Sequence, residues 1–123
     1  MLKFLLDEQI SPDVATGLRR KSKRIVVHCM AEWQDGRFLG LADELFLEEA
    51  ARHHFTLVTY DRNTIPPVLK TWGQEGRDHG GAVFVDPETI PSSDFGELIR
   101  ALQNLWDEAG DWDWTNRITT LRR

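Results

Sequence analysis

The segments "KFLLDEQISP" (residues 3–12) and "TLVTYDRN" (residues 56–63) share the pattern that decides how the chain folds. In each, a short apolar run of strand length stops at acidic residues, which are Asp7 and Glu8 in the first and Asp61 in the second. One acid in such a place is typical of a turn. Acids that follow separate strands raise the question of whether they meet in the folded protein.

Strands and helices are predicted to alternate along the chain. Apolar and β-branched runs predict strands at residues 3–6, 25–29, 56–60 and 82–85, and a weaker alternation predicts a last short strand at 117–121. Helical spacing predicts helices that start at Ser11-Pro12, that cover 41–54 and 63–72, and that run from 95 to a stop at Gly110. This order is typical of an α/β fold, a three-layer sandwich around a mostly parallel central sheet of about four to five strands.

The helix over residues 41–54 is expected to bury one side against the sheet. Leu41, Leu45, Phe46 and Ala50 fall on that inner side by their spacing. Asp43 lies in its first turn, where an acid complements the helix dipole.

Length, charge and cysteine content limit the class of protein. The 123 residues and 14.2 kDa fit one domain over 1–123, with 111–123 as a C-terminal tail or short extra strand. The net charge of −5 argues against a general nucleic-acid coat, because Lys and Arg drive phosphate binding. A single cysteine, Cys29, excludes an internal disulfide and fits a reducing cytoplasm. Without a membrane-length apolar stretch or a secretory signal, we expect a cytoplasmic protein with no membrane partner.

The acids that follow the strands are expected at one edge of the sheet. In open parallel sheets, ligands bind beyond the carboxyl ends of the strands, near the point where the strand order reverses. Asp7, Glu8, Asp61 and Asp86 are expected there, and Asp43 can reach the same edge from its helix start. Clustered carboxylates repel one another, and the usual solution is Mg²⁺ or Mn²⁺, ions that activate water for attack at phosphorus. The pattern therefore indicates phosphodiester hydrolysis.

Each acid also has a simpler structural interpretation. Asp7 could cap the turn into the helix at Ser11, Asp43 could only complement a helix dipole, and Asp61 could be a turn residue. The pairing of Asp7 with Asp61 favours a functional role for these two residues, whereas the roles of Asp43 and Glu8 stay open. Asp86 precedes Pro87 and is expected to start a turn.

Basic and aromatic residues offer candidate RNA contacts. The basic run at 19–24 is typical of a solvated helix end, although Arg19 and Arg20 could instead guide RNA phosphates. Arg62 is better placed for that role, because it neighbours Asp61. Trp112 and Trp114 could stack on bases, but packing against the last helix or a partner chain is favoured.

Three segments carry a resemblance to a known family: "MLKFLLDEQISPDVATGLR" (1–19), "LADELFLEEAARHHFTLVTYDR" (41–62) and "GAVFVD" (81–86). They resemble the short stand-alone PIN-like proteins of bacteria, in the PIN-domain ribonuclease superfamily that includes VapC-type toxins. The resemblance spans residues 1 to about 105. It implies a ribonuclease fold that depends on Mg²⁺ or Mn²⁺, with Asp7, Asp43 and Asp61 as catalytic and metal-binding residues and Glu8 as an accessory ligand. It also implies RNA as substrate and an antitoxin protein as partner. A homodimer is a further partner that the sequence leaves open.

One departure from the family keeps a second hypothesis open. PIN-like relatives commonly follow the third-strand acid with another acid and an aromatic residue, whereas this chain has Arg62, Asn63 and Thr64. The alternative is a catalytically degenerate PIN-like module that binds RNA or a protein partner without turnover. A phosphoacceptor receiver domain ranks last, because "AVFVDPE" (82–88) lacks the lysine that such a domain needs.

Overall fold

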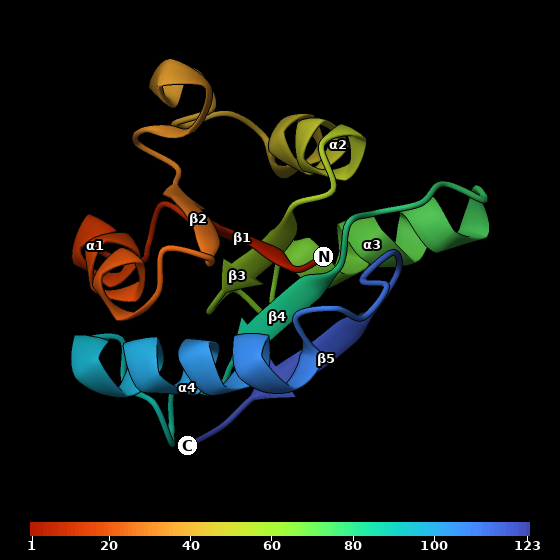
Figure 1. Cartoon of the computed structure of the whole chain (residues 1–123). Helices are drawn as coiled ribbons and strands as arrows, with labels where there is room; N and C mark the ends of the chain where they lie inside the picture. The colour runs from red at the N-terminus through yellow and green to blue at the C-terminus, as the bar shows by residue number, and fades with distance from the viewer.

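The structure is a computed structural model that describes the whole chain, residues 1–123, around a parallel β-sheet (Figure 1). Its five strands lie in the order β2-β1-β3-β4-β5, and all neighbouring pairs are parallel. In chain order the elements are β1 (Lys3–Leu6), α1 (Pro12–Lys21), β2 (Val26–Cys29), the 3-10 helix η1 (Trp33–Gly36), α2 (Asp43–Arg52), β3 (Thr56–Thr59), α3 (Ile65–Gln74), β4 (Ala82–Val85), α4 (Phe95–Ala109) and β5 (Ile118–Leu121). The predicted α/β fold is confirmed, and the C-terminal segment supplies the fifth strand.

Helices cover both faces of the sheet and make three layers. One face packs against α1 and α4 through buried residues such as Phe4, Leu6, Val14, Leu18, Val58, Val83, Leu98 and Leu102. The other face packs against α2 and α3 through buried residues such as Leu5, Phe46, Leu47, Leu57, Ile65, Trp72 and Phe84. Side chains alternate between the faces along each strand, so Asp7 follows Leu5 onto the α2/α3 side.

Local signals place the helix starts. Ser11 accepts a hydrogen bond from the backbone N–H of Asp13, and Pro12 occupies the first turn of α1. Asp94 accepts from the N–H of Glu97 at the start of α4, the longest helix. The predictions for these two helix starts are confirmed.

The inner face predicted for α2 is wrong at two positions. The helix begins at Asp43, and the side chains of Leu41 and Leu45 are 45 % and 49 % exposed. Phe46 and Ala50 are buried as predicted, together with Leu47. These three residues set which side of the helix faces the sheet, so Leu45 is turned away from it. Leu41 precedes the first turn and does not share the helical spacing.

The order of the strands reverses between β1 and β3. From β1 the chain passes through α1 to β2 on one side, and α2 then returns it to β3 on the other side of β1. Because α1 and α2 lie on opposite faces, the carboxyl ends of β1 and β3 mark the place where open parallel sheets commonly bind ligands. Asp7 and Asp61 follow these two strands, so the topology brings the segments 3–12 and 56–63 together at the carboxyl edge of the sheet.

The connection through α4 differs from the other three connections. Both α3 and α4 carry the chain to the next strand in the same direction, yet they lie on opposite faces. The crossover through α4 therefore has the opposite hand to the right-handed crossovers usual in such sheets. This arrangement leaves the α2/α3 face of β5 uncovered, and Ile118 is 55 % exposed there.

The helices are short relative to a bilayer, and none combines the length and the apolar character needed to span a membrane.

Candidate active site at the carboxyl edge of the sheet

Asp7 is a buried acid at the end of β1. The residue is 7 % exposed, and its backbone N–H continues the sheet by donating to the carbonyl of Val58 at 2.9 Å. Burial raises the pKa of Asp7 above its ordinary value. Hydrogen bonds from the Thr59 hydroxyl and the Glu8 N–H oppose that rise, and the negative charges of Asp43 and Glu8 add to it. An ionised Asp7 is thus held in a place that disfavours negative charge.

Thr59 connects the two acids that end β1 and β3. Its hydroxyl donates to Oδ2 of Asp7 at 2.6 Å and accepts from the backbone N–H of Asp61 at 2.9 Å. Leu6 pairs with Val58 in the parallel register, so the next residues, Asp7 and Thr59, are neighbours across the strands. Sequence reasoning missed Thr59, although the threonine two residues before Asp61 shares its side of the alternating pattern.

Asp61 has a different environment from Asp7. Its carboxylate accepts from the backbone N–H groups of Asn63 and Thr64, each at 2.8 Å, and from the Thr64 hydroxyl. Partial burial raises the pKa of Asp61, but these three hydrogen bonds outweigh it and hold the pKa below its ordinary value. Asp61 therefore organises the turn into α3 and stays ionised, which is also the turn role considered from the sequence.

Asp43 and Glu8 approach Asp7 from the loop before α2. Asp43 is the first residue of α2 and partly buried, and its charge contributes to the raised pKa of Asp7. The Glu8 carboxylate accepts from the backbone N–H of Gly40 at 3.2 Å, which ties the β1–α1 loop to the loop before α2. Gly40 has a φ of 72°, a conformation that glycine adopts without strain.

The acidic residues at this edge do not form a closed metal cage. No three His, Cys, Asp or Glu side chains are grouped so that they could hold a metal ion together. The predicted four-residue set of Asp7, Glu8, Asp43 and Asp61 is therefore not gathered as one cluster. Asp7, Glu8 and Asp61 each accept from a backbone N–H group, and Asp7 also accepts from the Thr59 hydroxyl. The charge of Asp43 acts on Asp7 and raises its pKa, and Mg²⁺ commonly binds through one or two carboxylates while keeping several waters.

A pocket of about 580 Å³ opens beside Asp61. It is lined by Gln9, Tyr60, Asp61, Arg62, Asn63, Thr64, Pro87 and Ser92. Arg62 is exposed and is the one cation in this lining, which suits contact with an anionic ligand. Tyr60 is held in place by a hydrogen bond from its hydroxyl to the carbonyl of Ile90 at 2.9 Å.

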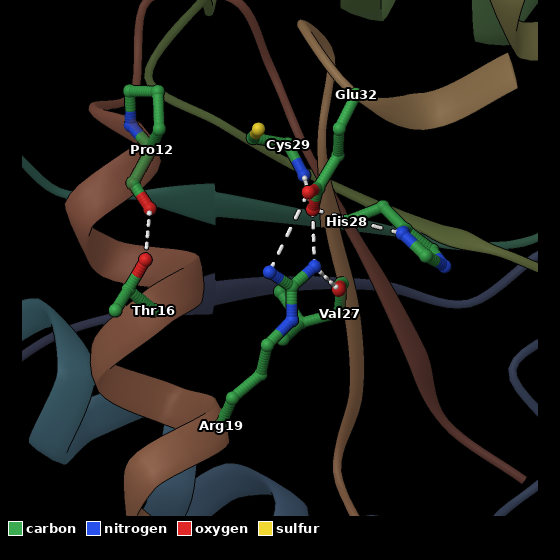
Figure 2. A network of polar contacts seen from close by, with 7 residues as sticks. All are labelled: Pro12, Thr16, Arg19, Val27, His28, Cys29 and Glu32. Carbon is green, nitrogen blue, oxygen red and sulfur yellow. Dashed lines mark hydrogen bonds and ion pairs between the residues drawn. The ribbon is translucent and has the colours of Figure 1, made fainter. Parts of the chain in front are cut away.

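The other predicted contacts lie elsewhere. Arg19 donates to both carboxylate oxygens of Glu32 and to the carbonyl of Val27 at 2.6 Å, so its guanidinium is engaged within the fold (Figure 2). Arg20 is exposed in the last turn of α1 and forms no ion pair. Asp86 accepts from the N–H of Glu88 at 3.0 Å, the turn role expected for it. Trp114 is buried and donates to the carbonyl of Ala109, which confirms that it packs against the last helix.

Comparison of the chain with protein-family models, curated proteins and solved structures finds no match.

Proposed function

We propose that the protein is a PIN-like ribonuclease that holds a hydrated Mg²⁺ or Mn²⁺ at Asp7 and Asp43 and hydrolyses RNA phosphodiester bonds. One observation carries the proposal. The buried Asp7 lies where the strand order reverses. Hydrogen bonds through the Thr59 hydroxyl connect its carboxylate to the backbone of Asp61, and the negative charge of Asp43 contributes to its raised pKa. Open parallel sheets commonly bind ligands at this point of reversal, and a cation would relieve the repulsion between the two carboxylates.

The chain's own residues have separable roles in this proposal. Asp7 and Asp43 hold the ion, and Thr59 fixes the orientation of the Asp7 carboxylate. A bound divalent ion supplies a more acidic water and neutralises charge on the phosphate. Arg62, exposed in the adjacent pocket, contacts a phosphate of the RNA and orients it. Hydrolysis joins the water oxygen to phosphorus, breaks one P–O bond of the chain, and passes a proton to the leaving ribose oxygen.

The family resemblance supplies the rest of the proposal. A toxin paired with an antitoxin protein follows from that resemblance, and a cytoplasmic location follows from the single cysteine, rather than from any contact in the fold.

A nuclease assay with matched variants tests the function. Purified protein is incubated with a labelled mixed RNA pool in Mg²⁺, Mn²⁺ or chelator. Asp7→Asn and Asp43→Asn should abolish cleavage, because each removes one of the two negative charges that hold the ion. Asp107→Asn is the matched control, since Asp107 is exposed on α4 and forms no side-chain hydrogen bond or ion pair. Arg62→Ala should raise KM more than it lowers kcat.

Cleavage that persists in chelator, or that survives Asp7→Asn, contradicts this mechanism. Circular dichroism of each variant shows whether a loss of activity reflects a loss of fold.

A second candidate rests on the engagement of Asp61. Three hydrogen bonds already occupy its carboxylate, and no group of three acids is present. A binding module without turnover would retain RNA or protein binding at this edge and show no cleavage with any divalent ion. Binding and cleavage measured on the same RNA pool separate the two candidates.

A further inference from the structure

The pocket beside Asp61 is built by the loops that follow three neighbouring strands. Gln9 follows β1, residues 60–64 follow β3, Pro87 follows β4, and Ser92 lies before α4. Its volume of about 580 Å³ is within the range of small-molecule sites.

Most of the free hydrogen-bonding groups in this pocket are uncharged. The side-chain amides of Gln9 and Asn63 and the hydroxyl of Ser92 form no hydrogen bond within the protein. The hydroxyls of Tyr60 and Thr64, by contrast, are already bonded within the fold. A side-chain amide places a donor and an acceptor side by side. Two such amides in one pocket suit a ligand whose edge carries both donors and acceptors.

The charges of the pocket lining balance. Asp61 and Arg62 are its only ionised residues, and three hydrogen bonds occupy the Asp61 carboxylate. The Arg62 side chain is exposed and forms no hydrogen bond or ion pair. The lining therefore suits an uncharged body with one negative group beside Arg62, rather than a cation or a polyanion.

The start of α3 offers few groups to a second anion. Pro66 and Pro67 lie in its first turn and have no N–H. The two backbone N–H groups just before the helix already donate to Asp61. A phosphate at this end of the pocket therefore depends on Arg62, which leaves the rest of the lining for an uncharged group.

Tyr60 is the one aromatic residue of the lining. It packs against the α1/α4 core, and the carbonyl of Ile90 fixes its hydroxyl, so its position is set before a ligand arrives. Proteins bind unpaired bases by hydrogen bonds to the base edge and by contact of an aromatic ring with the base face. A nucleobase offers such an edge and a planar face, whereas a sugar offers hydroxyl groups.

The pocket is connected to the proposed metal-binding acids. Gln9 lies two residues after Asp7, and the Thr59 hydroxyl bonds to both the Asp7 carboxylate and the Asp61 N–H. Asp7 lies on the α2/α3 side of the sheet, whereas Tyr60 packs on the α1/α4 side. A nucleotide chain that crosses the carboxyl edge would therefore present a base to the pocket and a phosphate to Asp7.

We propose that this pocket binds one unpaired base of the RNA, close to the phosphate that is cleaved. The amides of Gln9 and Asn63 bond to the edge of the base, Tyr60 contacts its face, and Arg62 contacts the adjoining phosphate. The inference rests on the proposed function for RNA as the ligand, and it names the residues that read a base.

NMR titration with single nucleotides tests the pocket without turnover. The ¹⁵N-labelled protein is titrated in chelator with the four nucleoside 5′-monophosphates, with the corresponding nucleosides and with ribose 5-phosphate. We expect at least one nucleotide to give saturable shifts of the side-chain NH₂ signals of Gln9 and Asn63. Ribose 5-phosphate has no base and should bind at least about tenfold more weakly, because it loses the hydrogen bonds to both amides.

Variants separate contacts to the base from contacts to the phosphate. Gln9→Ala and Asn63→Ala should each weaken nucleotide binding by roughly three- to tenfold, the scale of one lost hydrogen bond, and leave ribose 5-phosphate unchanged. Arg62→Ala should weaken nucleotides and ribose 5-phosphate but leave nucleosides unchanged. Gln74→Ala is the matched control, since Gln74 is exposed at the end of α3 and forms no side-chain hydrogen bond.

The inference is overturned if no nucleotide shifts these signals at millimolar concentration, or if ribose 5-phosphate binds as tightly as the nucleotides. It is also overturned if Gln9→Ala and Asn63→Ala bind like the wild type, or if glucose gives the same shifts as the nucleosides. Base binding without RNA cleavage would contradict the nuclease and leave the base pocket standing. Cleavage that depends on Asp7, without base binding, would contradict only the base pocket.

Discussion

Asp7 and Asp61 both end a strand, yet their carboxylates have opposite effects on stability. Burial and the charge of Asp43 raise the pKa of Asp7, so its ionised form destabilises the folded state at neutral pH. Asp7→Asn should therefore raise the melting temperature in metal-free buffer. Asp61→Ala removes three accepted hydrogen bonds in the turn before α3 and should lower the free energy of unfolding by about 1 kcal/mol. Thermal unfolding of both variants with chelator present is the measurement.

The contributions of Asp7 and Asp61 to stability should also change with pH in opposite directions. The folded pKa of Asp7 lies above 3.8, so stability contributed by this residue falls as pH rises from 3.8 through the folded value. The folded pKa of Asp61 lies below 3.8, so its contribution is present above that pH and is lost as pH falls through the folded value. If Asp7→Asn and Asp61→Ala shift the melting temperature in the same direction, the environments assigned here are wrong.

The buried His79 should make the stability of the protein depend on pH in the mildly acidic range. Burial lowers the pKa of His79 below 6.5, while Asp78 opposes that change. Its Nδ1 accepts a hydrogen bond from the N–H of Gly81 at 3.0 Å, which a protonated Nδ1 could not do. The unfolded state therefore binds more protons, and stability should decline as pH falls from 6.5 through the folded pKa.

Urea unfolding between about pH 5 and pH 8 measures this decline. His79→Asn should flatten it within that window. His54→Asn, at an exposed histidine, should leave it unchanged. A decline that is the same in all three proteins would show that another group is responsible.

At the scale of elements, α2 carries the clearest energetic contrast. Leu47 is 3 % exposed, whereas its neighbour Leu45 is 49 % exposed. Leu47→Ala should lower the free energy of unfolding by about 2–5 kcal/mol, because it leaves a cavity in the α2/α3 core. Leu45→Ala should change it by less than about 0.5 kcal/mol. Equal losses in denaturant unfolding would mean that α2 is turned differently on the sheet.

This contrast also shows what sequence patterns resolve at the element scale. Apolar runs and helix caps located the strands and most helices, because both signals are local. The inner face of α2 was misassigned because Leu41 and Leu45 are four apart and mimic a buried stripe. Only the packing of Phe46, Leu47 and Ala50 against the sheet decides which side is buried.

At the scale of the molecule, the alternation of strands and helices predicted the parallel sheet. Asp7 and Asp61 lie near each other because β1 and β3 are neighbouring strands. Sequence patterns constrain this strand order but do not determine it. The Thr59 hydroxyl that connects these acids required the structure itself, because it depends on side-chain directions at the ends of the strands. The hydrogen bonds that Asp61 accepts in the turn before α3 agree with the turn role considered from the sequence.

The central claim is that Asp7 and Asp43, beyond the carboxyl ends of β1 and β3, bind a divalent cation. Titration of ¹⁵N-labelled protein with Mn²⁺ tests it most directly, because the paramagnetic ion broadens amide signals near its binding site. We expect the amides of Glu8 and Asp43 to broaden first in the wild type, and that early broadening to disappear in Asp7→Asn and in Asp43→Asn. Early broadening at another acidic surface, or a pattern unchanged by Asp7→Asn, would contradict the claim.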